Sequence, residues 1–227
     1  MLRKQKHRRA LKIGHWLIKR RFTGGYDLVG RTLWELGRQV EATECLEKGV
    51  KEFPTMYLLW SYLGEYRSLM GQYDLAIEAF EHSRHSSQPD VALYNIGLVH
   101  ARSGRHEDAI RYLSPIELSR DNRITVWAHN TLAHVYTELG EFELARSTWQ
   151  TVCEFSYKVV AGTEGEEDLA LSFGRWAIVE HKLGNLHEAQ RILKLGQKFN
   201  PFQVDVLEAE RLLNAVPLSG GFLFEVV

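Results

Sequence analysis

Five glycines organise this sequence, and each of them is followed by an alanine five residues later. The pairs are Gly37 and Ala42, Gly71 and Ala76, Gly104 and Ala109, Gly140 and Ala145, and Gly184 and Ala189. Each glycine is preceded by a small residue at the seventh position and a large apolar residue at the eighth, and followed by another large apolar residue at the ninth. Such a set, repeated about every 34 residues, is typical of a solenoid of helix-turn-helix units.

Each position of the pattern has a structural reason. Glycine can adopt the left-handed backbone conformation that ends a helix, because it has no Cβ atom. We expect the small residue before the glycine and the alanine after it to face each other across the hairpin, so that the two helices pack closely. One hairpin cannot bury its apolar face alone, whereas stacked hairpins form a continuous core. The pattern therefore predicts an all-α chain.

The second copy of the pattern resembles the tetratricopeptide repeat. Its matching residues are Trp60, Leu63, Gly64, Gly71, Tyr73, Ala76 and Phe80. The resemblance covers residues 23–202, in copies at about 23–56, 57–89, 90–123, 124–157 and 168–202. It implies an all-α, right-handed superhelical solenoid of about five repeats, with Pro54 and Pro201 closing the first and fifth copies. The fourth copy departs from the family in having Ala133 where glycine is usual. Pro115 should end the second helix of the third copy early or kink it.

The spacing of the glycines and the residues beyond Pro201 complete the organisation. The glycines lie 34, 33, 36 and 44 residues apart, which indicates an insertion of about ten residues before the fifth copy. We place this insertion within Tyr157–Asp168 and expect an exposed acidic linker. Residues 203–216 are expected to form a helix that caps the last repeat. For the apolar C-terminal tail, residues 217–227, folding back onto the array and acting as a linear ligand for a partner stay open as alternatives.

Charge is divided sharply between the N-terminus and the rest of the chain. Residues 1–21 contain nine basic residues and no acidic one. They are Arg3, Lys4, Lys6, Arg8, Arg9, Lys12, Lys19, Arg20 and Arg21. Because the whole chain has 28 basic and 29 acidic residues, the remainder carries 19 against 29, a net charge of −10. Interspersed apolar residues predict a basic amphipathic helix over residues 1–22.

Three roles are open for this N-terminal helix. Its apolar face could cap the first repeat, with Ile13, Trp16, Leu17 and Phe22 providing the covering surface. Polybasic residues beside tryptophan and leucine also suit an anionic membrane surface. Nucleic acid is the third alternative, although the acidic remainder of the chain would repel phosphates and the sequence contains no base-reading motif.

First-helix residues that point away from the hairpin core predict a concave groove for a partner. In the second half of the array they are Tyr94, Leu98, Arg102, Trp127, Asn130, His134, Ile178, His181 and Lys182. In the first half they are Asp27, Arg31, Trp34, Glu35 and Glu65. Aromatic and apolar anchors beside hydrogen-bonding groups suit a peptide or helix of a partner protein. The alternative is that about half of these side chains pack between repeats, as half-buried helix residues do.

The resemblance implies a non-catalytic protein–protein interaction scaffold or assembly adaptor. The alternative function is that of a peripheral membrane-associated or nucleic-acid-associated assembly factor that uses the basic N-terminal helix. Some members of the family hold the C-terminal carboxylate of chaperones with lysines, asparagines and an arginine. Asn95 matches one asparagine of that clamp, but Ser61, Glu65, Trp127 and Thr131 stand at other clamp positions. Recognition of chaperone tails is therefore not expected.

Signals for catalysis, metals and cofactors are poor. The sequence contains no phosphate-binding loop, nucleophile elbow or zinc-protease motif. His82 and His85 have a spacing that could hold a metal, but no cysteine or acid stands beside them at a ligand interval. We expect no enzyme activity, no cofactor and no metal. Cys45 and Cys153 are expected to be buried thiols, and no segment has a transmembrane or secretory pattern. These features predict a cytoplasmic protein, with membrane-peripheral location as the alternative.

Overall fold

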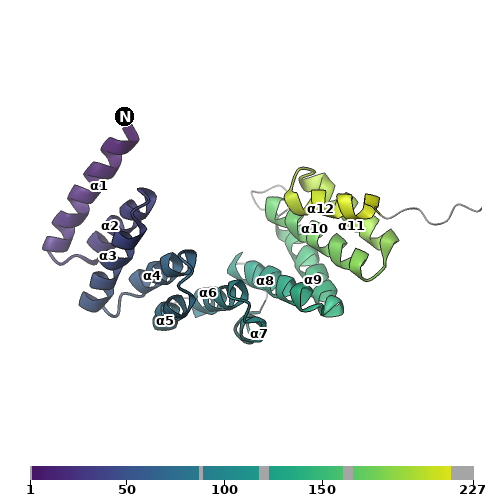
Figure 1. Ribbon diagram of the computed structural model, residues 1–227, viewed down its shortest axis with the longest axis horizontal. Coiled ribbons are helices and arrows are strands. Elements are labelled where there is room, and N and C mark those ends of the chain that lie inside the picture. The colour runs from purple at the N-terminus through teal and green to yellow at the C-terminus, as the bar shows by residue number, and fades with distance from the viewer. Residues whose placement is uncertain (1, 87–88, 118–122, 161–165, 216–227) are drawn as a thin grey trace, which may run out of the picture. The chain divides into compact units, whose positions relative to one another are not determined.

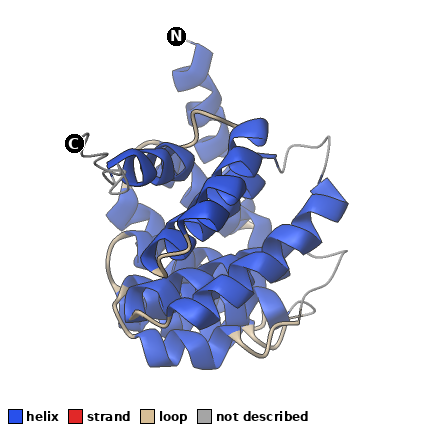
Figure 2. Ribbon diagram, turned by 90° about the vertical axis from the view of Figure 1, so that its right-hand side faces the viewer, coloured by secondary structure: helices blue, strands red, loops and turns tan. Residues whose placement is uncertain are grey.

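The computed structural model of the chain describes residues 2–86, 89–117, 123–160 and 166–215. Every regular element in these residues is an α-helix, and Figure 2 shows no strand among them. The all-α class expected from the sequence is therefore confirmed. The chain divides into two compact units, Met1–Ile116 and Glu117–Val227. Each is described by itself.

The first unit contains an N-terminal helix followed by three helical hairpins (Figure 1). Its helices are α1 (Leu2–Lys19), α2 (Thr23–Glu35), α3 (Gln39–Glu52), α4 (Tyr57–Leu69), α5 (Tyr73–Ser83), α6 (Pro89–Arg102) and α7 (His106–Leu113). The first hairpin consists of α2 and α3, the second of α4 and α5, and the third of α6 and α7. Each hairpin packs on the next. Leu46, Leu59 and Leu63 are among the fully buried side chains of this stack.

The second unit contains two hairpins and a last helix. Its helices are α8 (Arg123–Leu139), α9 (Phe142–Val160), α10 (Glu166–Lys182), α11 (Leu186–Phe199) and α12 (Val204–Ala215). Helix α12 packs on α10 and α11. Gly174 of α10 permits this contact, because a Cβ atom there would lie 2.6 Å from the carbonyl carbon of Asp205 in α12. Arg175 forms an ion pair with the same Asp205, whose side chain is buried. The C-terminal tail, residues 217–227, lies outside the described residues.

The turn glycines adopt the backbone conformation that the sequence pattern predicts. Their φ angles lie between +75° and +79°, a region that side chains rarely adopt. The five alanines that follow them are all 0% exposed. Both observations agree with hairpins in which the second helix packs tightly against the first.

The expected pairing of small residues across the hairpin is wrong in detail. The nearest side chain to Gly30 is Leu46, that to Gly64 is Phe80, and that to Gly97 is Leu113. In these three hairpins, the glycine of the first helix therefore lies closest to the large residue nine positions after the turn glycine, and not to the alanine. A Cβ atom at Gly64 would lie 2.8 Å from the Phe80 ring, closer than normal packing allows.

Two departures from a regular repeat have visible causes. Helix α7 is only 8 residues long and ends at Leu113, as Pro115 predicts. The insertion before the fifth copy is partly helical, because α9 continues to Val160 and α10 begins at Glu166. Within Tyr157–Asp168, where the insertion was expected as an exposed linker, the first and last residues are therefore helical, and residues 161–165 lie outside the described residues.

Helix α1 packs along α2, beside which it runs in Figure 1. Gly14 is buried against Val29, and Leu11 and Ile18 pack on the core of the first unit. Three of the four residues expected to provide the covering surface do not do so, because Ile13 is 55%, Trp16 51% and Phe22 55% exposed, whereas Leu17 is half-buried. The contact is made by the face of α1 that carries Gly14, since a glycine permits closer helix approach than a large side chain.

Candidate functional site

Helix α2 contacts α4, and α4 contacts α6. The surface that these three helices form together is called here the first-helix wall. Trp34 of α2 stacks on Tyr66 of α4 with ring centroids 4.1 Å apart. The Arg31 guanidinium lies 5.9 Å from the ring centroid of Tyr62. Burial raises the pKa of Tyr66 to about 12, so its phenol stays neutral at physiological pH. These aromatic contacts fix α2 against α4 and give the wall a rigid end.

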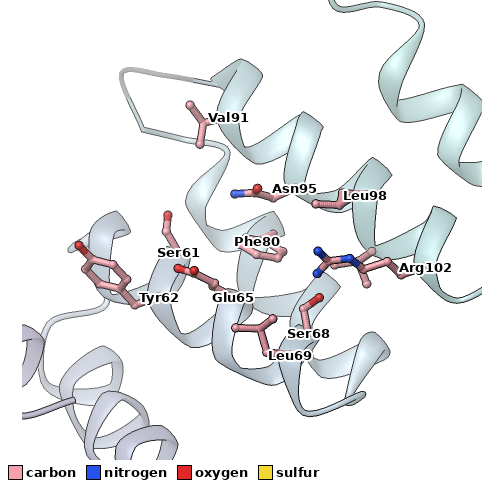
Figure 3. A pocket seen from close by; sticks show the side chains of 11 residues that line it. Ser61, Tyr62, Glu65, Ser68, Leu69, Phe80, Val91, Asn95, Leu98 and Arg102 are labelled. Carbon is pink, nitrogen blue, oxygen red and sulfur yellow. The ribbon is translucent and has the colours of Figure 1, made fainter. Parts of the chain in front are cut away.

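A pocket of about 360 Å³ opens between α4 and α6 in this wall (Figure 3). Its lining residues are Ser61, Tyr62, Glu65, Ser68 and Leu69 of α4, Phe80 of α5, and Val91, Asn95, Leu98, Val99 and Arg102 of α6. Spacings of three and four residues place these side chains on one face of each helix. The volume falls within the range of about 300 to 1,000 Å³ that is usual for ligand sites.

Four polar groups of the pocket have no hydrogen-bond or ion-pair partner among the described residues. They are the Glu65 carboxylate, the Ser68 hydroxyl, the Asn95 amide and the Arg102 guanidinium. Ser68 is only 7% exposed, and its Oγ is fully buried. Buried polar groups normally have a partner, since an unmet hydrogen bond costs about 1 to 3 kcal/mol. The pocket therefore offers hydrogen-bonding capacity that the described part of the chain does not use.

The pocket has two chemically different ends. Figure 3 shows Glu65 and Asn95 toward one end, and Ser68 and Arg102 toward the other. Glu65 is exposed, yet the pocket wall displaces part of its hydration shell and raises the pKa of its carboxyl group. Leu98 of α6 and Leu69 of α4 add apolar surface to the lining. A ligand with an apolar side chain between groups of opposite charge fits this arrangement.

Of the nine groove residues predicted for the second half of the array, the structure places three in the first unit. Leu98 and Arg102 line the pocket. Tyr94 is half-buried and does not line it, because it stands one position before Asn95 on α6 and faces a different direction. Sequence reasoning did not place Ser68 or Asn95 in the groove. The same helical spacing from Leu98 and Arg102 would have found Asn95, whereas the unpaired state of Ser68 has no sequence signal.

The other six predicted groove residues belong to the second unit. Trp127 of α8 is 37% exposed, and its indole N–H donates to Asp168 of α10 at 3.4 Å. The Asn130 amide oxygen accepts a hydrogen bond from Ser172 of α10 at 3.1 Å. The single indole donor of Trp127 and part of the hydrogen-bonding capacity of Asn130 are therefore used to join α8 to α10.

The remaining four residues differ widely in exposure. His134 is exposed and lies 3.6 Å from Glu138 on the same helix. Lys182 is exposed and His181 is half-buried. Ile178 is only 7% exposed and belongs to the hydrophobic core of the second unit, which corrects its assignment to a groove. Its side chain fills space beneath the helix surface, where a partner has no access.

Other candidate chemistry is limited in the described residues. His82 stacks on Trp60, with ring centroids 4.1 Å apart, so its ring has a packing role. No group of three or more potential metal-ligating side chains gathers in the described part of the chain. Cys45 and Cys153 are free thiols, and burial raises the pKa of both. Among the described helices, none combines the length and apolar character that a membrane span requires.

Comparison with known proteins gives the repeat its family. Residues 126–151, which cover most of α8 and the first part of α9, match the family model of the tetratricopeptide repeat. This segment of the chain is a tetratricopeptide repeat. The matched segment contains Gly140 and Ala145 of the fourth copy. The family model therefore matches the same hairpin pattern that the spacing of the glycines indicates.

Solved tetratricopeptide-repeat structures have the same fold at low sequence identity. PilW, a type IV pilus biogenesis factor, matches 92% of this chain and 93% of its own with a TM-score of 0.70 and 15% identity. YrrB, described as having an unusual peptide-binding site, matches 82% of this chain and 91% of its own with a TM-score of 0.59 and 17% identity. A chain of the Cut9–Hcn1 hetero-tetramer of the APC/C matches 92% of this chain with a TM-score of 0.66 and 18% identity.

The likeness to these structures concerns the fold alone. The chain spans only 39% of the length of its match in the Cut9–Hcn1 assembly. No curated protein sequence matches the chain. The pocket in the first-helix wall is therefore the feature of this chain that bears on its function.

Proposed function

We propose that this tetratricopeptide-repeat protein is a non-catalytic interaction scaffold that binds a peptide segment of a partner protein in the pocket between α4 and α6. The observation that carries this proposal is the set of unpaired polar groups around an open pocket. Protein partners are common to the fold, and YrrB is a structural relative with a peptide-binding site. Fold alone does not specify a ligand, so the pocket chemistry must do so.

Each polar group suits a particular part of a peptide. The Asn95 amide can donate to a backbone carbonyl and accept from a backbone N–H at the same time. The Glu65 carboxylate is an acceptor when ionised and favours a lysine or arginine side chain. Arg102 supplies several donors in a planar fork that matches a carboxylate. The preferred segment therefore carries a basic residue, an apolar residue and an acidic residue, with the apolar side chain contacting Leu98.

Selection of short random peptides displayed on phage against the full chain tests this proposal. We expect the enriched peptides to combine a basic, an apolar and an acidic residue. The selected peptide is then synthesised and its Kd measured by fluorescence anisotropy. Glu65→Gln and Arg102→Gln should each weaken binding by about tenfold, since a charged hydrogen bond contributes about 1.5 to 3 kcal/mol.

Matched control variants separate the pocket from general charge effects. Glu78→Gln on α5 and Lys51→Gln on α3 remove exposed charges outside the pocket lining, and both should leave the Kd unchanged. Peptides that lack the charged residues, or binding that survives both Glu65→Gln and Arg102→Gln, would show that the pocket does not hold the partner.

The second unit offers a second contact surface in this proposal, at Trp127 and Asn130. The supporting observation is an indole that is 37% exposed beside a side-chain amide on the same helix. A Trp127→Ala, Asn130→Ala double variant should weaken binding of the whole partner protein while the Kd of the selected peptide stays unchanged. Loss of a good aromatic anchor costs about 2 kcal/mol. Unchanged partner binding would remove this surface from the proposal.

A further inference from the structure

Helix α1 has a face that its packing on α2 leaves uncovered. This face carries Lys6, Arg9, Ile13 and Trp16, and Arg20 extends it from the turn directly after the helix, where it contacts Trp16. Spacings of three and four residues align these side chains along one stripe of the helix. All five are exposed, and the buried Gly14 stands on the opposite side against Val29. The set of five is called here the outer stripe.

The outer stripe is cationic and has no compensating acid nearby. Helix α1 contains no acidic residue. The acids that reach the N-terminal segment are on its packed side, where His7 lies 3.0 Å from Glu35 and Arg21 lies 3.0 Å from Glu52. Lys6, Arg9 and Arg20 have no ion pair among the described residues. Their positive charge therefore faces outward.

Apolar side chains stand within this charge. Ile13 is 55% and Trp16, in the last turn of α1, is 51% exposed. The Arg20 guanidinium lies 3.9 Å from the centroid of the Trp16 ring. This cation–π contact holds a positive charge directly beside an exposed aromatic ring. Tryptophan and arginine in this combination suit the boundary between lipid headgroups and acyl chains.

We propose that the outer stripe of α1 docks on an anionic lipid bilayer, with the helix axis parallel to the membrane surface. The basic side chains contact phosphate and carboxylate groups of the lipids, while Ile13 and Trp16 enter the headgroup region. An anionic bilayer attracts residues 1–21 and repels the remainder of the chain, whose net charge is −10, so the protein docks by this face. The inference is independent of the pocket between α4 and α6.

An interleaved apolar surface favours a bilayer over nucleic acid. Phosphates of RNA would satisfy the three cations, but they would leave the aliphatic side chain of Ile13 in water. The bilayer satisfies both components of the stripe, because burying apolar area stabilises the docked state by roughly 25 cal/mol per Å². The two chemistries therefore make different demands on Ile13, which the experiment uses.

Vesicle flotation with the full chain tests the proposal. The probes are vesicles of phosphatidylcholine alone and vesicles of phosphatidylcholine with phosphatidylserine. We expect the protein to float only with the anionic vesicles and to be released as salt shortens the screening length. The triple variant Lys6→Gln, Arg9→Gln, Arg20→Gln should bind the anionic vesicles about tenfold or more weakly. Each basic residue near an anionic surface contributes to the free energy of binding. The triple control Lys48→Gln, Lys51→Gln, Lys198→Gln removes equal charge from exposed positions elsewhere and should bind as the unchanged chain does.

A second variant tests the apolar part of the stripe. Ile13→Ser, Trp16→Ser keeps every charge and should still lose most vesicle binding. Circular dichroism and thermal melting should match the unchanged chain, since both side chains are exposed. The proposal is overturned if the full chain fails to float with anionic vesicles. It is also overturned if the serine variant binds them normally, or if polyuridylate binds the full chain more tightly than the vesicles do.

Discussion

Leu113 of α7 occupies the space where Gly97 of α6 lacks a side chain. A Cβ atom at Gly97 would lie 2.5 Å from Leu113 Cγ, which is the branch point of the side chain and cannot turn away. Leu113 is 0% exposed, so other residues enclose its side chain on every side. The absence of one methyl group in α6 thus determines how closely the third hairpin closes.

This relationship predicts the effect of Gly97→Ala. Alanine forms helix better than glycine by about 1 kcal/mol, yet the clash with Leu113 should make the variant less stable by about 1 to 3 kcal/mol. Urea unfolding followed by circular dichroism measures the change. Gly24→Ala is the matched control, because nothing lies within 4 Å of a Cβ at Gly24 in α2. That variant should be unchanged or more stable, and equal behaviour of the two would contradict the packing described.

The contact of α1 with α2 predicts a loss of stability when it is broken. Gly14→Leu places a large side chain against Val29, which is 1% exposed, and should lower the melting temperature of the first unit. Lys12→Leu adds a similar side chain at an exposed position of the same helix and serves as the control. Removal of residues 1–22 should destabilise the protein in the same way as Gly14→Leu. A truncated chain that melts normally would mean that α1 contributes nothing to the repeats.

His100 predicts a loss of stability under mildly acidic conditions. It is 7% exposed, and its burial, followed by the charge of Arg105, lowers its pKa below the ordinary value. The unfolded chain then binds this proton more readily than the folded one. The contribution is fully present above the unfolded pKa of about 6.5 and is lost as pH falls through the folded value.

Urea midpoints at about pH 7.5 and about pH 5.5 measure this contribution. The chain has ten histidines, so the comparison with His100→Gln isolates the effect of this one. The variant should lose less stability than the unchanged chain between the two pH values. An identical loss in both would assign the pH dependence to the other histidines.

Glu65 predicts a separation of stability from binding. Its pKa is raised by desolvation alone, so the folded state disfavours the ionised carboxylate, and this penalty is present above the unfolded pKa. At neutral pH, Glu65→Gln should therefore leave the free energy of unfolding equal or higher. The same substitution should weaken binding of the selected peptide. Urea unfolding and peptide titration of the same sample check the two effects. A marked loss of stability would show that the carboxylate has a structural partner.

The sequence predicted the hairpins because their requirements are local. A turn glycine and its following alanine lie within one hairpin, so a fixed spacing reveals them without knowledge of the rest of the chain. The early end of α7 followed from Pro115 for the same reason. The orientation of α1 was not predictable in this way, because Ile13 and Leu11 are both apolar and only tertiary packing decides which of them is buried.

The pocket was less accessible to sequence reasoning than the fold. Leu98 and Arg102 are four residues apart, a spacing that places both on the same face of a helix, and the structure places both in the pocket lining. The lack of a partner at Ser68 depends on what α6 places opposite α4, which no spacing within one helix reports. Ile178 shows the converse, since the packing of neighbouring helices on α10 buries a position that an unpaired helix would expose.

The fit of Leu46 to Gly30, Phe80 to Gly64 and Leu113 to Gly97 has a consequence for how such a chain can change length. In each case the recess and the side chain that fills it belong to the same hairpin, so duplicating or deleting a whole hairpin preserves their match. Exchange of one helix between hairpins would bring a phenylalanine to a recess shaped for leucine. The hairpin, not the single helix, is therefore the unit in which this protein can gain or lose segments without repacking its interior.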